Sequence, residues 1–260
     1  MTPHWFELVA WATLGLGFAS ALVIAGDIFL LGNRQHMAIM NLVFPLTALY
    51  MGPLALWGYL ARGRRMSRKQ MQASPMMERE ARDSWWQVSL SDTHCGAGCA
   101  LGDIAGEWLV WATAWMIGST AVLGPEYILD LPLAWIFGIL FQYLAIAPAR
   151  GQVGQLAPLR DAIKSDTLSV LSFEIGLFGW MALSHYVIWR PPLPIDSSGH
   201  WFMMQIGMSL GFLTSWPVSR WLLRKGVKEP MNAGPAAYSG HGHEPRALVA
   251  AATFQGSEHG

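Results

Sequence analysis

The sequence has few charged residues for its length. Asp, Glu, Lys and Arg make up 13% of the 260 residues, whereas soluble proteins usually have about 25%. Basic and acidic residues balance at seventeen each, so no basic excess indicates a nucleic-acid partner. Two cysteines are too few for a disulfide framework. The chain is instead 53% apolar, which is the composition of a membrane protein.

Long apolar runs define the predicted fold. A helix needs about 20 apolar residues to cross the hydrocarbon core, and six runs qualify: 8–31, 37–61, 100–123, 127–147, 167–189 and 201–223. We therefore predict an all-α polytopic membrane protein with about six transmembrane helices over residues 1–228. The segment 229–260 is rich in Gly, Ala, Ser and His and has no periodicity, so we expect a disordered tail.

The distribution of basic residues predicts the orientation. With six spans, fifteen of the seventeen Lys and Arg residues fall on one side, in the loop 62–90, the connection 148–166 and the segment after residue 219. Only Arg34 and Arg190 fall on the other side. Because basic loops stay in the cytoplasm, we predict cytoplasmic N and C termini, a cytoplasmic loop 62–90, and location in the inner (cytoplasmic) membrane.

The stretch from residue 91 to residue 107 carries the most chemistry. Residues 91–93 read Ser-Asp-Thr, which are N-cap residues, so we expect the third helix to begin there. Four side chains then recur at every fourth position, which places them on one face of a helix. A helix N-terminus favours the thiolate form that binds metals. The predicted metal ligands are these four and the adjacent histidine: His94, Cys95, Cys99, Asp103 and Glu107.

A packing interpretation of the same stretch remains open. Gly98, Gly102 and Gly106 also recur at every fourth position, and such small-residue spacing is typical of a helix packed tightly on a neighbour. Free cysteine is commonly a small buried apolar residue. Carboxylates facing lipid cost about 2.5–3.5 kcal/mol, so we expect Asp103 and Glu107 to face other helices or water.

The stretch resembles a known family. The run His-Cys-Gly-Ala-Gly-Cys followed by Leu-Gly-Asp is similar to the core of a family of uncharacterised bacterial multi-pass membrane proteins, classed as a domain of unknown function. The resemblance covers roughly residues 90–225 and depends mainly on His94, Cys95, Cys99, Gly102 and Asp103. It implies a membrane location and supplies no activity.

Further soft and polar side chains lie within the predicted spans. Glu174 is placed at a depth where it could form a polar relay with Asp103 or Glu107. Under the six-span topology, Met and His gather at the outer ends of the spans. This predicted outer metal-uptake group comprises His36, Met37, Met40, Met181, His185, His200, Met204 and Met208. Thioether and thiolate ligands together are preferred by Cu(I).

These observations favour transport or trafficking of a soft transition metal, with Cu(I) as the expected ion. A metallochaperone or a partner membrane subunit would be the expected protein partner, beside the lipid bilayer. One alternative is a membrane thiol redox protein, although the spacing C-x₃-C differs from the common C-x-x-C; haem is not indicated. Another alternative is a non-catalytic membrane subunit or assembly factor. No nucleophile elbow or P-loop is present, so the sequence does not point to an enzyme.

Overall fold

Long helices make up the body of the molecule. The computed structural model describes residues 2–69, 84–113 and 125–228, and within these ranges the regular elements are helices, with no strand. The longest are α1 (His4–Phe29), α6 (Ser84–Thr113), α7 (Pro125–Ala149), α8 (Leu156–Leu183) and α9 (Ser198–Arg224). A π-helical turn, η3 (Ser184–Ile188), extends α8. The predicted all-α class is confirmed.

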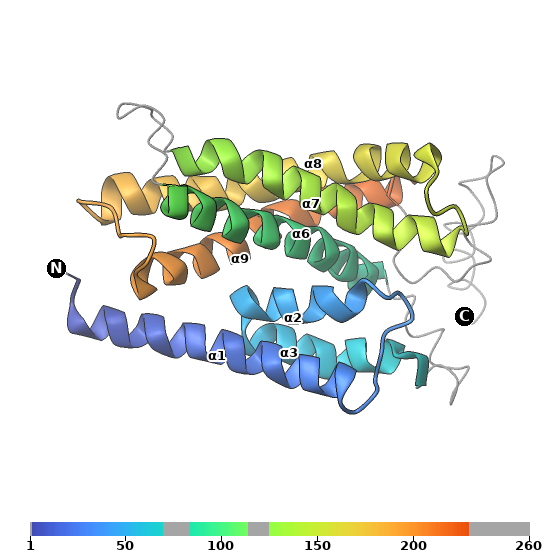
Figure 1. The fold of residues 1–260 in the computed structure, drawn as a ribbon, viewed down its shortest axis with the longest axis horizontal. Helices are drawn as coiled ribbons and strands as arrows, with labels where there is room; N and C mark the ends of the chain where they lie inside the picture. Colours follow the sequence, from blue (N-terminus) through green and yellow to red (C-terminus); the bar gives the residue numbers. More distant parts are fainter. Residues whose placement is uncertain (1, 70–83, 114–124, 229–260) are drawn as a thin grey trace, which may run out of the picture.

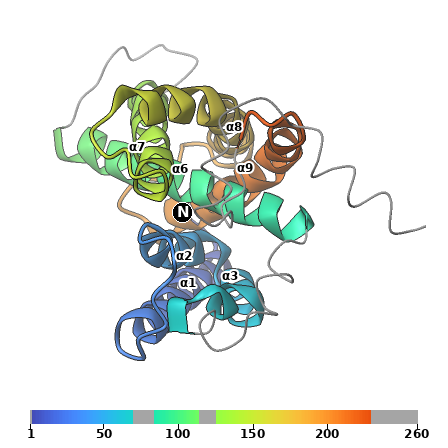
Figure 2. The same ribbon diagram turned by 90° about the vertical axis from the view of Figure 1, so that its right-hand side faces the viewer.

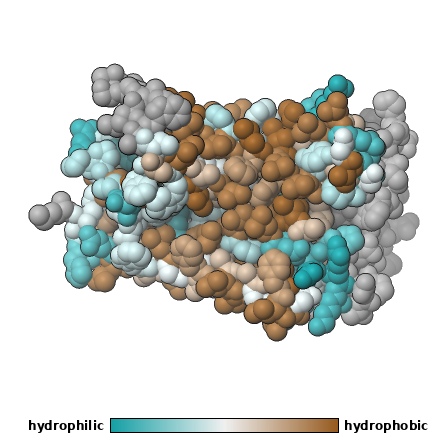
Figure 3. Space-filling view, viewed as in Figure 1, coloured by the Kyte–Doolittle hydropathy of each residue, from teal (hydrophilic) through white to brown (hydrophobic). Residues whose placement is uncertain are grey.

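One face of the molecule is apolar in the middle and polar at both ends. Figure 3 shows an apolar band between two hydrophilic ends. Three helical segments are long and apolar enough to cross a membrane: His4–Phe29, Tyr127–Pro148 and Leu156–Ile188. Helices α6 and α9 are long but less apolar, since α6 carries three acidic residues and α9 is rich in glycine and serine. Of the predicted run 100–123, residues 114–123 lie outside the described residues, as does the tail 229–260.

The predicted second span is a hairpin of two short helices. Helix α2 (Met40–Met51) is followed by Gly52, where the chain reverses. Helix α3 (Pro53–Gly58) then runs back beside α2 and continues into η1 (Tyr59–Gly63) and η2 (Arg64–Met66). An isolated bridge between Gln35 and Ser67 joins the two ends of the hairpin. The twelve residues of α2 extend about 18 Å, well short of the ~30 Å hydrocarbon core. The prediction of a single span over 37–61 is therefore wrong.

Gly52 allows the reversal. Its φ of 54° and ψ of −128° lie in a region that only glycine adopts without strain. Pro53 follows as the first residue of α3, where its missing N–H costs nothing. The carbonyl of Leu49, near the hairpin tip, accepts a hydrogen bond of 2.7 Å from the Gln205 side chain of α9.

Helix α1 begins at the end of the bundle opposite that where α9 finishes. At the start of α1, the Phe6 ring packs on Trp189, 4.5 Å between centroids. At its other end, Asp27 pairs with Arg64 at 3.1 Å and accepts a 2.7 Å hydrogen bond from Tyr59. Figure 1 shows α1 running from the end opposite that where α9 finishes. The predicted location of both termini on one side of a membrane is therefore not confirmed.

Basic residues mark one end of the bundle. We call this the basic end: α1, α7 and α9 finish there, and α6 and α8 begin there. Thirteen of the fourteen Lys and Arg residues in the described ranges lie there, including Arg34, which was predicted on the opposite side. Arg190 alone of these fourteen lies at the opposite end, which we call the far end.

Helix α6 lies at the centre of the arrangement. Viewed from the basic end, α6 passes between the group α1–α2–α3 and the group α7–α8–α9 (Figure 2). Buried side chains form two clusters on either side of it. Helix α6, which carries Cys95 and Cys99, therefore lies between two buried clusters.

Candidate functional site

The stripe of every-fourth-residue side chains on α6 is buried throughout. Cys95, Cys99 and Asp103 have no exposed surface, and Glu107 is 1% exposed. Asp103 and Glu107 thus face protein, as their cost in lipid predicts. Cys95 and Glu107 are separated by about 18 Å along the helix axis. Within the described ranges, no group of three or more His, Cys, Asp and Glu residues is arranged to hold one metal ion. The stripe is a line of polar groups rather than a single ligand shell.

Helix α6 begins earlier than predicted. Its first residue is Ser84, about two turns before Ser91. Asp92 is consequently inside the helix, where its carboxylate accepts hydrogen bonds of 2.9 Å from Ser215 and 2.8 Å from Ser219 of α9. The prediction that residues 91–93 cap the helix is wrong, and the N-terminal helix dipole does not act on the thiols.

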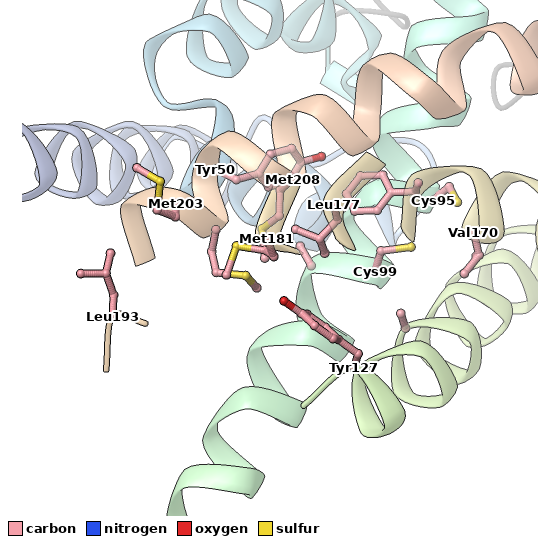
Figure 4. Close-up of a cluster of buried hydrophobic side chains, with 14 of the residues drawn as sticks. Tyr50, Cys95, Cys99, Tyr127, Val170, Leu177, Met181, Leu193, Met203 and Met208 are labelled. Atoms are coloured by element: carbon pink, nitrogen blue, oxygen red, sulfur yellow. The ribbon is translucent and has the colours of Figure 1, made fainter. Parts of the chain in front are cut away.

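The two thiols are adjacent and face a carboxyl group. Both cysteines are free, their side chains lie in contact, and the carboxyl group of Glu174 on α8 lies beside Cys99. Tyr50 comes from the hairpin tip, and its hydroxyl approaches the α6 backbone at Gly96. Figure 4 shows Tyr50, Cys95 and Cys99 in one buried cluster.

Methionine sulfur continues from the thiols towards the far end. Met181 of α8 and Met203, Met204 and Met208 of α9 belong to the same buried cluster as the cysteines, and each is at most 6% exposed. Met181, Met203 and Met208 can be followed in Figure 4. The cluster therefore holds six sulfur atoms along the interface of α6, α8 and α9.

Acidic and histidine side chains accompany the sulfur atoms. Asp103 lies within electrostatic range of Glu174, Glu107 and Asp130, and its carboxyl oxygens have no hydrogen-bond partner among the described residues. Nearer the far end, Glu107 and His200 approach each other at 3.4 Å, and both side chains are 1% exposed. The carboxyl groups of Glu174 and Asp103 therefore lie near each other.

Two further groups complete the far end of this line. The rings of His185 and His200 lie 6.0 Å apart between centroids. The Tyr127 hydroxyl is 3.3 Å from Nδ1 of His185. The far end thus brings together two imidazoles, a phenol and the Glu107 carboxyl group; His185 is partly buried and the other three side chains are buried.

The predicted outer group is divided between the two ends of the bundle. His185, His200 and the three predicted methionines of α8 and α9 lie together as described. His36 is exposed, and Met37 and Met40 belong to the second cluster, beside α1 and α3. These three residues lie apart from the far-end group because α1 finishes at the basic end and the segment 30–40 follows it there. The His94 ring is buried against Phe141 of α7, with centroids 6.1 Å apart.

Glycine packing is also present. A Cβ at Gly98 would contact the backbone of Gly138 at 2.8 Å, and one at Gly102 would overlap the backbone of Ala134. The glycine stripe is thus covered by α7 of the same chain, and these two positions are closed to a partner helix. Close packing of α6 on α7 and an inward polar stripe coexist on different faces of α6.

Sequence reasoning missed Tyr50, Tyr127, Asp130 and Lys228. Asp130 could have been found, because a carboxylate inside the apolar run 127–147 is a functional signal by itself. Tyr50 could not, since its role depends on the hairpin that carries it.

Comparison with known proteins identifies the family. No curated protein and no solved structure matches the chain. The sequence model of one family matches residues 84–228, which include α6, α7, α8 and α9 and both cysteines. Because this match covers more than half of the sequence, the chain belongs to the family described as Domain of unknown function (DUF4396).

Proposed function

We propose that this chain is a membrane transport protein for a soft monovalent metal ion, Cu(I), which passes along the interface of α6, α8 and α9. One observation carries the proposal: two thiols and four thioethers lie in one buried cluster along that interface. Sulfur ligands of these two kinds prefer Cu(I). A linear series of sites, each of low coordination number, suits an ion that must be released again.

The arrangement in the membrane is part of the proposal. We place α1, α6, α7, α8 and α9 across the bilayer and the α2–α3 hairpin as a re-entrant element. The strong excess of Lys and Arg at the basic end supports a cytoplasmic location for that end. The C terminus would then be cytoplasmic and the N terminus external, in the inner membrane of a bacterium.

The hairpin tip supports a transport role. Its backbone changes direction beside Gly17, near the middle of α1, and therefore near the middle of the bilayer in this arrangement. Non-helical backbone at that depth is tolerated where it is buried or lines a cavity, and interrupted helices mark the binding sites of many transporters. Tyr50, at this tip, faces the thiol pair.

The chemistry of the path follows from its groups. An ion entering from the far end would meet His185, His200 and the thioethers, which bind without losing a proton. Binding of one Cu(I) by Cys95 and Cys99 as thiolates would release two protons and leave a complex of charge −1. The carboxyl group of Glu174, beside Cys99, is placed to receive one of these protons. Only the thiol pair thus couples ion binding to proton release.

Anaerobic titration of reduced protein with Cu(I), against a competing chelator, tests the site. We expect stoichiometric binding by the wild type and its loss in Cys95→Ser/Cys99→Ser. Met208→Leu should lower Cu(I) uptake into proteoliposomes, whereas Met40→Leu should leave it unchanged, since Met40 is an equally buried methionine in the other cluster. Equal weak binding by wild type and the cysteine variant would refute the proposal.

A second candidate function is thiol redox chemistry. Residues four apart on a helix have Cα atoms about 6 Å apart, which a disulfide can bridge, and the two thiols are in contact. Oxidation to the disulfide would pass two electrons and two protons to an acceptor such as a quinone. Met208→Leu separates the two functions, because redox cycling of the thiols does not require the thioethers.

A further inference from the structure

Lys228 points into the protein. It follows the end of α9, at the basic end of the bundle, where a lysine side chain usually extends into water. Here it is 1% exposed, and its Nζ donates hydrogen bonds of 3.0 Å to Asp166 and 3.3 Å to Ser169, both on α8. An ammonium group is taken out of water only where partners compensate for its lost hydration.

The surroundings of this ammonium group are built from oxygen atoms of three helices. The Ser169 and Ser219 hydroxyls are 3.3 Å apart, and Ser219 and Ser215 both donate to Asp92. None of these side chains exposes more than 2% of its surface, and Oδ2 of Asp166 has no hydrogen-bond partner within the described part of the chain. The ammonium group thus contacts Asp166 and Ser169 directly, and a hydrogen-bonded network continues from Ser169 through Ser219 to Asp92 and Ser215.

This donor set is distinct from that of the thiol pair. Carboxylate and hydroxyl oxygens are ligands of hard cations, whereas the thiols select soft ones. The two sites are nevertheless neighbours, because Cys95 lies within electrostatic range of Asp166, Lys228 and Asp92. The oxygen site lies between the thiol pair and the basic end of the bundle.

We propose that Asp92, Asp166, Ser169 and Ser219 form a binding site for a small monovalent cation, and that the Lys228 ammonium group fills it and closes the basic end of the path. Withdrawal of Lys228 opens the site to a free cation such as Na⁺, K⁺ or methylammonium. The cation site stands independently of the proposed function, whereas the closing role rests on it.

The charge of Lys228 agrees with this role. Burial lowers the pKa of Lys228, but the nearby acidic groups, Asp166 first, raise it by a larger amount. The pKa of Lys228 therefore lies above its ordinary value. The side chain is therefore an ammonium ion at neutral pH, tied to α9 by the backbone hydrogen bond of 3.3 Å from Lys228 N to Leu222 O.

The site is tested by removing the Lys228 ammonium group and supplying a free cation in its place. Full-length Lys228→Ala is compared with Lys225→Ala, an exposed lysine three residues away, by thermal unfolding in N-methylglucamine chloride. We expect the midpoint of Lys228→Ala to fall by about 10 °C, and to recover saturably when methylammonium, Na⁺ or K⁺ replaces N-methylglucamine at constant ionic strength. Wild type and Lys225→Ala should not respond.

Two controls make the outcome decisive. Asp166→Asn added to Lys228→Ala should abolish the saturable recovery. An unchanged midpoint in Lys228→Ala, or no saturable recovery with any small cation, would overturn the site. If Lys228→Ala yields no folded protein in N-methylglucamine, it is purified in methylammonium throughout; folding there supports the site, and failure in every cation contradicts it.

The closing role is tested by Cu(I) flux into proteoliposomes. Lys228→Met should raise the initial rate several-fold over wild type and over Lys225→Met. An unchanged or lower rate, with wild-type flux present, would refute the closing role alone. Absence of flux in the wild type would refute the proposed function, while the cation-recovery experiment would still decide the site.

Discussion

Gly52→Ala should destabilise the protein, because the hairpin requires backbone dihedral angles at residue 52 that a residue with a side chain adopts only with strain. The φ of Gly52 is 54°, and a side chain there costs about 1–3 kcal/mol. A Cβ at this position would meet its nearest atom, Gly17 N, at 3.8 Å, which is an ordinary contact. The expected loss is therefore conformational rather than steric, and we expect about 2 kcal/mol, or a fall of roughly 4–8 °C in Tm.

Gly58→Ala provides the matched control. Gly58 lies six residues later at the end of α3, with φ −59° and ψ −42°, and the nearest neighbour of an added Cβ is 4.0 Å away. Alanine in such a helical position stabilises by about 0.5–1 kcal/mol relative to glycine. Thermal unfolding of both variants in detergent should show shifts of opposite sign. Equal shifts, or a Gly52→Ala variant as stable as the wild type, would refute the reversal at Gly52.

Three further predictions concern packing, charge and topology. Gly102→Leu should lower the free energy of unfolding by at least about 3 kcal/mol, because its Cβ would overlap the backbone of Ala134. Gly179→Leu should be neutral, because no atom lies within 4 Å of an added Cβ there. Equal losses in the two variants would contradict the packing of α6 on α7. Asp27→Asn should lower stability by about 1–2 kcal/mol, since it removes the partner of Arg64 and weakens the bond from Tyr59; no change in Tm would contradict that contact. Reporters fused to the N and C termini should report opposite sides of the membrane, and the same side would contradict the arrangement of five crossing helices.

The sequence predicted the helices well because long apolar helices can be recognised from composition over long windows. Each of the six apolar runs overlaps a helix, and the spacing of Cys95, Cys99, Asp103 and Glu107 correctly predicted an inward face. Such patterns repeat within one element and need no knowledge of its neighbours. The sequence also contained the turn signal Gly52-Pro53, but the apolar run around it was long enough for a full span, and run length took precedence.

The remaining errors arise where the environment of a residue depends on a helix that is distant in the sequence. Residues 91–93 carry the side chains of an N-cap, yet Asp92 is satisfied by Ser215 and Ser219 from α9, so the helix continues through them. Lys228 has the position of a solvated basic residue that only orients the chain, yet Asp166 draws it inward. Both exceptions meet in one oxygen-lined site beside the thiols. Polar residues that depart from their local preference are buried only where partners compensate for lost hydration, so their coincidence at one place is itself an argument for function there.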